Sequence, residues 1–422
     1  MAKQRTANQG IRKGSVRILG LRLISSAGLF ALLLLGPLKL PGADNSPAVL
    51  NGIDVLRERN FDLLAGKRIG LITNQTGLAA DGTSTIDLLF KSKACTLVAL
   101  FSPEHGIRGM MDESVRSSVD DATGLPIHSL YGEVKRPTPE MLKELDALVF
   151  DVQDIGARFY TYISTMAYCM EAAAKANISF IVLDRPNPIG GFRVEGPMLD
   201  ADKISFIGYM PLPVRHGMTV GELARYFNAE NRIGARLQVV PMKGWRRSYY
   251  FWDTGQVWVN PSPNMRTMPA ALLYPGICLL ERTNVSVGRG TDRPFEMIGA
   301  PWIEPRRFVS ALQAAGIAGV QFIPVYFTPD AAKHKGVRCG GASLLVTDAD
   351  RLNSVLLGLT LASVLNKLYP KEFKMDTIIT FLGNASAMEM LQAQQPPAKV
   401  LRSDNSNLRR FLARRQKALI YD

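Results

Sequence analysis

The sequence predicts an α/β fold, in which a Rossmann-like doubly wound parallel sheet domain is followed by a smaller α+β domain. From residue 67, short apolar runs rich in β-branched residues alternate with segments of helical periodicity, as in consecutive βα units. Near residue 235 the composition changes to segments rich in Trp and Tyr, followed by a Pro-rich stretch at 261–275. A chain of 422 residues is also longer than one hydrophobic core usually serves.

The expected elements follow this pattern in order. Five strands are expected at residues 68–73, 95–101, 127–130, 147–151 and 180–184. Helices are expected at residues 84–91, 139–145 and 161–176, with Thr83 and Thr138 as N-caps, and another helix ends near Asn231. In the second domain, strands are expected at 320–327 and 342–347 and a helix at 349–368.

Residues 1–43 have the composition of a secretory leader. Six basic residues and no acidic residue lie between Lys3 and Arg22, and the apolar run 23–35 follows them. That run is shorter than the roughly 20 residues needed to cross a bilayer, although an uncleaved N-terminal anchor remains the alternative. The expected organisation is therefore a signal peptide or anchor at 1–43, a Rossmann-like catalytic domain at 44–235 and an α+β domain at 236–422 that closes the cleft. The mature protein is expected in the periplasm or outside the cell.

Most of the positive charge belongs to this leader. Seven basic residues lie in residues 1–43, so the formal charge falls from +13 to +6 without them. No nucleic-acid partner is expected. The basic C-terminal segment 408–419 is expected to form an amphipathic helix with a solvated basic face, and weak contact with cell wall or a membrane surface is the alternative. The four cysteines lie far apart in the sequence, which favours buried free thiols and leaves one long-range disulfide as the alternative.

Polar side chains follow each of the five expected strands. In an open α/β sheet, ligands bind outside the carboxyl ends of the strands, so these loops predict a site at one edge of the sheet. The histidines and cysteines lack metal-ligand spacing, and neither a nucleophile elbow nor a phosphate-binding loop is present, so neither a metal nor another cofactor is expected.

Carboxylates remain as the candidate catalytic groups, and paired carboxylates are typical of glycoside hydrolysis. Glu104 ends an apolar strand after a proline and is the best candidate for a general acid, with His105 and Arg108 placed to tune its ionisation. The alternative is a helix-capping glutamate paired with Arg108. Glu281 is the candidate second carboxylate, and its alternative is an ordinary salt bridge to Arg282 or Arg289.

Further polar residues of these loops and of the second domain are candidates for binding sugar hydroxyls or an acidic substituent, and structural ion pairs are the alternative for the charged ones. These candidates are Asn74, Arg108, Asp151, Asp154, Arg158, Tyr160, Arg185, Asn187, Glu195, Arg215, His216, Asn264, Asn284 and Arg289.

The chain contains several long motifs: SPEHGIRG at 102–109, DVQD at 151–154, GARFYTY at 156–162, DRPNP at 184–188, VEGP at 194–197, RHGM at 215–218, PSPNM at 261–265 and NVSVGRGT at 284–291. Together and in this order they resemble the motifs of the NamZ (YbbC-type) exo-β-N-acetylmuramidases, and the similarity spans roughly residues 50–420. The resemblance implies a cleft between the two domains that removes N-acetylmuramic acid from the non-reducing ends of peptidoglycan fragments. It also implies a catalytic role for Glu104 and an acidic partner, the lactyl carboxylate, for the arginines.

Two other functions compete with this one at the level of sequence. The first is a glycosidase for another acidic sugar, with the same acid and a different pocket. The second is a periplasmic binding protein for an acidic sugar or muropeptide, because two α/β lobes around a polar cleft also suit capture without chemistry.

The leader gives a first testable prediction. A reporter that is active only outside the cytoplasm, fused after residue 60, is expected to be active because the basic and apolar regions follow in leader order. The same fusion without residues 2–43 is the control and is expected to be inactive. Cytoplasmic retention of the full fusion would refute export.

Overall fold

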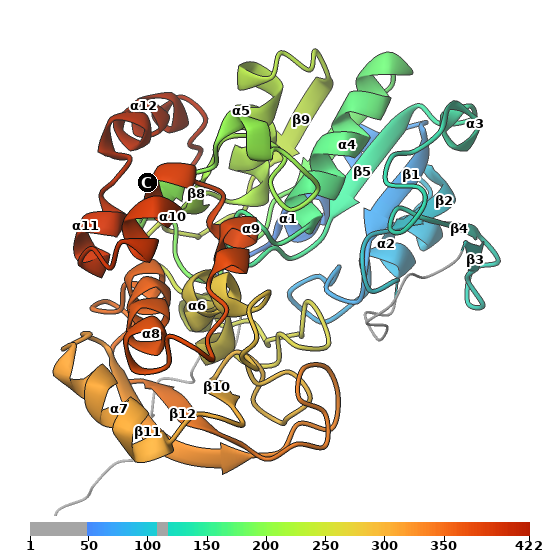
Figure 1. The fold of residues 1–422 in the computed structure, drawn as a ribbon. Coiled ribbons are helices and arrows are strands. Elements are labelled where there is room, and N and C mark those ends of the chain that lie inside the picture. Colours follow the sequence, from blue (N-terminus) through green and yellow to red (C-terminus); the bar gives the residue numbers. More distant parts are fainter. Residues whose placement is uncertain (1–48, 108–116) are drawn as a thin grey trace, which may run out of the picture. The chain divides into compact units, whose positions relative to one another are not determined.

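The structure is a computed structural model that describes residues 49–107 and 117–422. A seven-stranded sheet with the order β3-β4-β2-β1-β5-β6-β9 forms the larger domain (Figure 1). Its strands are β1 (Arg68–Thr73), β2 (Thr96–Ser102), β3 (Ser118–Val119), β4 (Pro126–Ser129), β5 (Ala147–Asp151), β6 (Ser179–Leu183) and β9 (Arg236–Val240). All neighbouring pairs are parallel except β3 with β4. The chain reverses its direction across the sheet between β1 and β5, as in a doubly wound fold, and the predicted fold class is confirmed.

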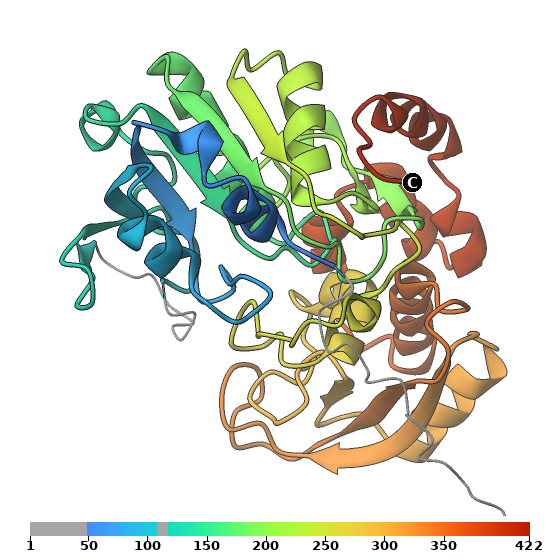
Figure 2. The same cartoon turned by 180° about the vertical axis from the view of Figure 1, so that it is seen from behind.

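The strands are almost entirely apolar because helices cover both faces of the sheet. Successive residues of one strand face opposite cores: Leu71 and Val149 face one core, and Ile72 and Phe150 face the other. Helices α1 (Gly52–Glu58) and α2 (Thr85–Lys91) pack into the first core, and α4 (Tyr162–Lys175) and α5 (Val220–Glu230) pack into the second (Figures 1 and 2). The short helix α3 (Pro139–Leu142) precedes β5.

Three details of the predicted elements differ from the structure. Helix α2 is capped by Ser84, whose hydroxyl accepts a hydrogen bond from the Ile86 amide, and not by Thr83. Thr138 does precede α3, but its side chain makes no capping hydrogen bond. The predicted domain boundary near residue 235 falls immediately before β9, which pairs with β6 along its whole length and therefore belongs to the larger domain.

The smaller domain is built on an antiparallel sheet with the order β10-β12-β11. Its strands are β10 (Met297–Ala300), β11 (Val320–Phe327) and β12 (Cys339–Val346), and α7 (Pro305–Ala314) packs against β11 and β12. Helices α6 (Met268–Ile277) and α8 (Ser354–Leu368) cross beside this sheet. Their crossing needs glycine, because a Cβ on Gly276 would lie 1.8 Å from the Ser354 carbonyl oxygen. The apolar core of α6 and α8 is continuous with that of α4 and α5.

The C-terminal helices return to the larger domain, so residues 236–422 are not one closed unit (Figure 1). These helices are α9 (Ile379–Leu382), α10 (Ala385–Gln392), α11 (Pro397–Leu401) and α12 (Asn405–Gln416), and they lie near the short hairpin of β7 (Glu195–Met198) and β8 (Pro213–Arg215). On α12, Phe411 packs on Tyr226 of α5 with 5.5 Å between ring centroids, and Arg414 pairs with Glu230 at 3.1 Å. The basic helix therefore uses its apolar side for tertiary packing.

The four cysteines lie in the described part of the chain, and all are free thiols. Cys169, Cys278 and Cys339 are buried, which agrees with the expectation of buried thiols, and Cys95 is partly exposed. Among the described residues, none of the helices has the length and apolar composition required to span a membrane.

Asp184 joins three parts of the larger domain behind the sheet edge. Its fully buried carboxylate follows β6 and accepts hydrogen bonds from the Gly221 amide at 2.8 Å and the Thr219 hydroxyl at 2.8 Å, at the start of α5. The Tyr421 hydroxyl, next to the C-terminus, donates to it at 2.6 Å. Burial raises the pKa of Asp184 to about 7, although these hydrogen bonds oppose the rise.

This raised pKa makes stability depend on pH. The folded protein holds the Asp184 proton more tightly than the unfolded chain, so the stabilisation is complete below about pH 4 and is lost as the pH rises through about 7. Between about pH 5 and pH 8, the free energy of unfolding of the parent is expected to fall relative to that of Asp184→Asn, which cannot titrate. Urea denaturation of both proteins across this range measures the difference, and parallel pH profiles would contradict the assignment.

Candidate active site

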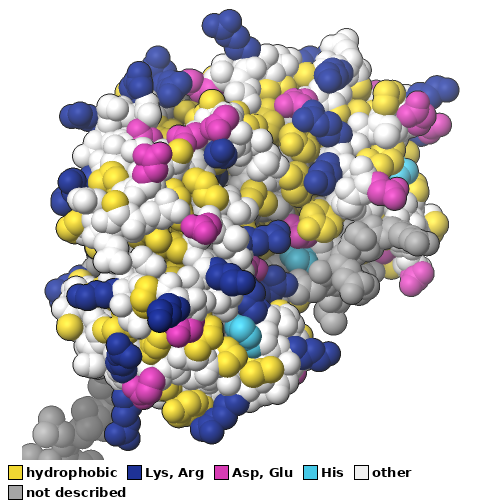
Figure 3. All heavy atoms as spheres, viewed as in Figure 1, with side chains coloured by type: hydrophobic (Ala, Val, Ile, Leu, Met, Phe, Trp, Pro, Cys, Tyr) yellow, Lys and Arg dark blue, Asp and Glu magenta, His cyan; other side chains and the backbone are white. Residues whose placement is uncertain are grey.

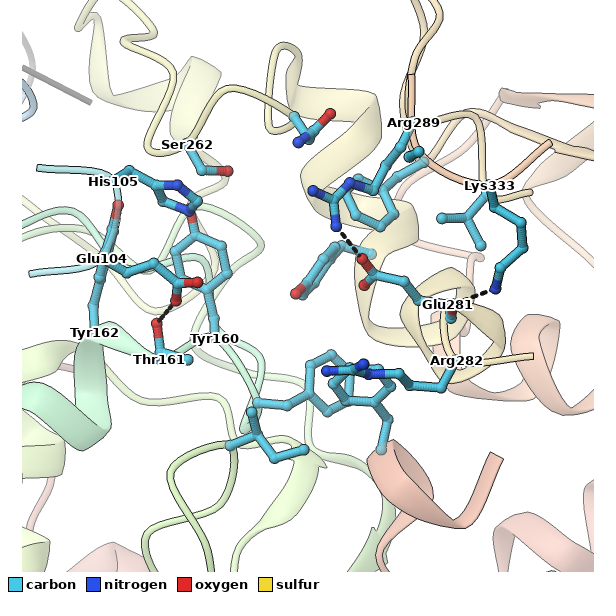
Figure 4. Close-up of a pocket in the computed structure, with 18 of the residues that line it drawn as sticks. Glu104, His105, Tyr160, Thr161, Tyr162, Ser262, Glu281, Arg282, Arg289 and Lys333 are labelled. Carbon is cyan, nitrogen blue, oxygen red and sulfur yellow. Dashed lines mark hydrogen bonds and ion pairs between the residues drawn. The ribbon is translucent and has the colours of Figure 1, made fainter. Parts of the chain in front are cut away.

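A cavity of about 560 Å³ lies between the loops at the carboxyl edge of the large sheet and residues of the smaller domain. The first domain contributes the loops that follow β2, β4 and β5, and the second contributes segments 262–295 and 332–333. In the space-filling view, Lys and Arg side chains gather beside the hollow between the two regions (Figure 3). The close-up shows Glu104 and Glu281 on opposite walls (Figure 4).

The first wall presents Glu104 from the turn that follows β2. Pro103 ends the strand, and the backbone then reverses through two residues with positive φ, His105 at 73° and Gly106 at 77°. A positive φ is unusual for a residue other than glycine and is found where function or packing imposes the conformation. The Thr161 hydroxyl, at the start of α4, donates a hydrogen bond to the Glu104 carboxylate (Figure 4). Glu104 is therefore held by a neighbouring loop as well as by its own turn.

Aromatic rings form a rigid surface beside Glu104. Tyr160 packs edge-to-face against Tyr162 and Tyr274, with centroid distances of 4.9 Å and 5.8 Å. Burial raises the pKa of both Tyr160 and Tyr162, so their hydroxyls stay protonated at neutral pH. Rings fixed in this way give the cavity an apolar surface of the kind on which sugar rings stack.

The second wall presents Glu281 from the end of α6. A 3₁₀ turn (Cys278–Leu280) continues this buried helix, and Glu281 follows it. The Arg289 guanidinium pairs with the Glu281 carboxylate at 2.6 Å, and the Cys278 thiol donates to the same carboxylate at 3.2 Å. These two partners hold the Glu281 carboxylate on the wall opposite Glu104, where it can stabilise positive charge that develops in the cavity.

A loop between β11 and β12 completes this wall. The Lys333 ammonium donates to the carbonyl oxygen of Glu281 at 2.9 Å and also to that of Thr283. Gly290 makes the approach of this loop possible, because a Cβ at this position would lie 2.4 Å from the Ala331 carbonyl oxygen. Burial lowers the pKa of Lys333.

Of the predicted site residues, six line this cavity: Glu104, His105, Tyr160, Asn264, Glu281 and Arg289. Arg108 lies outside the described residues. Four other predicted ligands form two buried ion pairs, Asp151 with Arg185 at 2.5 Å and Glu195 with Arg215 at 2.9 Å. For these four residues, the geometry supports structural ion pairs and not contact with a ligand.

The remaining predicted ligands are not among the residues that line the cavity and have structural partners. Arg158 is 1% exposed and donates to the carbonyl oxygens of Pro197, Leu212, Phe381 and Leu382. Asp154 and His216 lie side by side in the interior, and Asn74, Asn187 and Asn284 bond to nearby residues of the chain. Charged and polar residues in a loop look alike in the sequence whether they face a ligand or one another.

The structure adds cavity residues that the sequence analysis missed. They include Thr161, Ser262, Arg282 and Lys333. Thr161 lies inside the 156–162 motif and Arg282 directly follows Glu281. Their closeness in sequence to predicted site residues could therefore have indicated them. None of the aromatic residues in 245–258 lines the cavity.

Two carboxylates face each other across a cavity between an α/β domain and a second lobe, one held by a hydroxyl and the other by an arginine. Aromatic rings lie beside them. This is the arrangement of a glycoside hydrolase. Within the described residues, no group of three His, Cys, Asp or Glu side chains is placed to hold a metal ion.

Comparison with known proteins identifies the family. Residues 69–269 match the N-terminal domain model of the exo-β-N-acetylmuramidase NamZ, and residues 272–421 match the C-terminal model. The chain is 46% identical over 380 residues, which is 89% of this chain and 92% of the relative, to the peptidoglycan β-N-acetylmuramidase NamZ of Bacillus subtilis. The chain therefore belongs to the exo-β-N-acetylmuramidase NamZ family, as the motifs had indicated.

Solved structures agree with this assignment. Two crystal structures of DUF1343 family proteins from Bacteroides fragilis superpose with TM-scores of 0.82 and 0.73, at 37% and 30% sequence identity. Each alignment covers 89% of this chain and 99% of the solved chain.

The placement of Arg158 gives a prediction that separates structure from catalysis. Arg158→Met leaves several buried carbonyl oxygens without donors, so we expect the free energy of unfolding to fall by about 3–5 kcal/mol. In the fraction that remains folded, binding of substrate is expected to stay within about threefold of the parent. Denaturant unfolding and calorimetric binding on the same preparation measure both. A stable variant with impaired binding would restore Arg158 as a ligand of the substrate.

Proposed function

We propose that this protein is an exo-acting, metal-independent glycoside hydrolase that releases N-acetylmuramic acid from the non-reducing ends of peptidoglycan fragments, with Glu104 as the general acid. The observation that carries the proposal is the Glu104 carboxylate, which is held by Thr161 at the wall of the cavity and faces Glu281 on the other wall. Membership of the NamZ family supports the choice of substrate.

The chemistry follows from the two carboxylates. Protonated Glu104 donates its proton to the glycosidic oxygen while the bond from that oxygen to the anomeric carbon breaks, so the leaving sugar departs as a neutral alcohol. Positive charge develops on the anomeric carbon and is stabilised by the carboxylate of Glu281 across the cavity. A water molecule finally supplies hydroxide to the anomeric carbon, and its proton returns to Glu104, directly or through solvent, which restores the general acid.

The cavity suits recognition of a terminal acidic sugar. Its volume of about 560 Å³ is in the range of sites that enclose a small ligand. The aromatic surface at Tyr160 and Tyr274 offers stacking to the sugar ring, and cationic side chains on the Glu281 wall offer partners to its carboxylate. Action on peptidoglycan also agrees with the export proposed from residues 1–43.

An experiment distinguishes this function from two alternatives. A periplasmic binding protein would retain the acidic sugar without releasing product, and a glycosidase for a different acidic sugar would hydrolyse other glycosides in preference. A muramic acid-terminated disaccharide incubated with the leaderless protein separates the proposed enzyme from both alternatives, because only the proposed enzyme liberates free N-acetylmuramic acid from it.

The general acid gives a sharp prediction. Glu104→Gln keeps the shape of the side chain and removes its proton, so turnover is expected to fall by about 10² to 10⁴ while the binding of product changes little. Turnover of a chromogenic muramic acid glycoside, product binding and melting temperature are to be measured on one preparation.

Glu389→Gln is the matched control, because Glu389 is exposed on α10 and does not line the cavity; its turnover is expected to equal that of the parent. If Glu104 served only as a structural cap, its substitution would cost about 1 kcal/mol of stability and leave turnover within a few fold. Near-parental turnover in well-folded Glu104→Gln would place the acid elsewhere, with Glu281 as the next candidate.

A further inference from the structure

Three Lys or Arg side chains of the described residues line the cavity, and folding gives two of them partners. Arg289 pairs with the Glu281 carboxylate, and Lys333 donates to two backbone carbonyls. The third, Arg282, is exposed, and its guanidinium makes neither an ion pair nor a hydrogen bond with any residue of 49–107 or 117–422. Figure 4 shows the Arg282 side chain extending from the Glu281 wall into the cavity.

The backbone that carries Arg282 is fixed on both sides. The Lys333 ammonium binds the carbonyl oxygens of Glu281 and Thr283, the two residues that flank Arg282. The carbonyl oxygen of Arg282 itself accepts a hydrogen bond from the Thr377 hydroxyl at 2.9 Å. Three successive carbonyls are thus held, so the unpartnered guanidinium is presented from a rigid base, which reduces the entropy lost when a ligand binds.

The charge around Arg282 also favours an anion. Among the described residues that line this wall, three cations accompany the single carboxylate of Glu281. The positive charge of Arg282 is close enough to Lys333 to contribute to the lowering of that lysine's pKa. An anion that enters here gains attraction from both cations, and a guanidinium can bind a carboxylate through two parallel hydrogen bonds.

We propose that Arg282 binds the lactyl carboxylate of N-acetylmuramic acid and so determines the preference for this sugar over N-acetylglucosamine, which lacks the lactyl group. This inference rests on the proposed function of the same cavity. Arg158, Arg185 and Arg215 are not available for the role, because each is buried and already bonded to protein acceptors.

The test compares an acidic ligand with its neutral counterpart. Binding of N-acetylmuramic acid, its lactyl methyl ester and N-acetylglucosamine is measured by calorimetry for the parent, Arg282→Ala and Arg282→Gln. Each Arg282 variant is expected to bind the acid about 10- to 100-fold more weakly than the parent does, the range for a lost charge-assisted hydrogen bond, and to bind the ester within about threefold of the parent. Arg306→Ala, at an exposed arginine of α7, is the control and is expected to match the parent.

The same comparison is made for hydrolysis with chromogenic glycosides of the acid and of the ester. The Arg282 variants are expected to lose the preference for the acid mainly through a higher KM. Equal loss for acid and ester, or an unchanged preference in a variant with parental melting temperature, would overturn the inference.

The binding measurements distinguish a failure of this inference from a failure of the proposed function. A parent that hydrolyses neither glycoside but prefers the free acid through Arg282 would remove the hydrolase proposal and leave the carboxylate site intact. A parent that binds the acid no better than the ester would remove the carboxylate site.

Discussion

The loops at the carboxyl edge of the large sheet depend on one contact, the buried ion pair between Asp151 and Arg185. Asp151 ends β5 and Arg185 follows β6, so the pair joins two neighbouring loops. Arg185 also donates to the carbonyl oxygen of Leu78, in the loop after β1, and the Thr85 hydroxyl donates to Asp151. Removing either charge would leave the other buried and unpaired, which is among the more damaging changes a fold can suffer.

This ion pair supports the candidate acid at a distance. The loop after β5 connects Asp151, the last residue of that strand, to Thr161, whose hydroxyl holds the Glu104 carboxylate. The same loop carries Tyr160, which packs against Tyr274 of the smaller domain. A loop fixed at one end by a buried charge pair can therefore fix both an acid from another strand and part of the opposite wall, as catalytic positioning requires.

The sequence predicted the sheet well and the site less well, for a physical reason. Runs such as Arg68–Thr73 and Ala147–Asp151 are covered on both faces, so they appear as continuous apolar segments with clear ends. Strand β9 alternates between exposed and partly buried positions before its buried last residue, and the sequence analysis named no strand there. The domain boundary, which was placed near residue 235 on a change in composition, falls immediately before this strand. Arg185 and Arg215 resembled substrate ligands because a loop sequence does not reveal the direction of a side chain. Arg282 was considered only as a partner for Glu281, whereas Arg289 takes that position.

The contrast between these arginines follows from the cost of removing charge from water. A guanidinium that folding buries has to find acceptors within the protein, since an unpaired buried charge would destabilise the fold by several kcal/mol. Arg158 and Arg215 satisfy this requirement and are left with little capacity for a ligand. A cation that remains solvated in a concave site pays this desolvation penalty only when an anion replaces the water. Selectivity for an acidic sugar is therefore expected from an exposed side chain on a fixed backbone, while the buried charges keep the walls of the cavity in place.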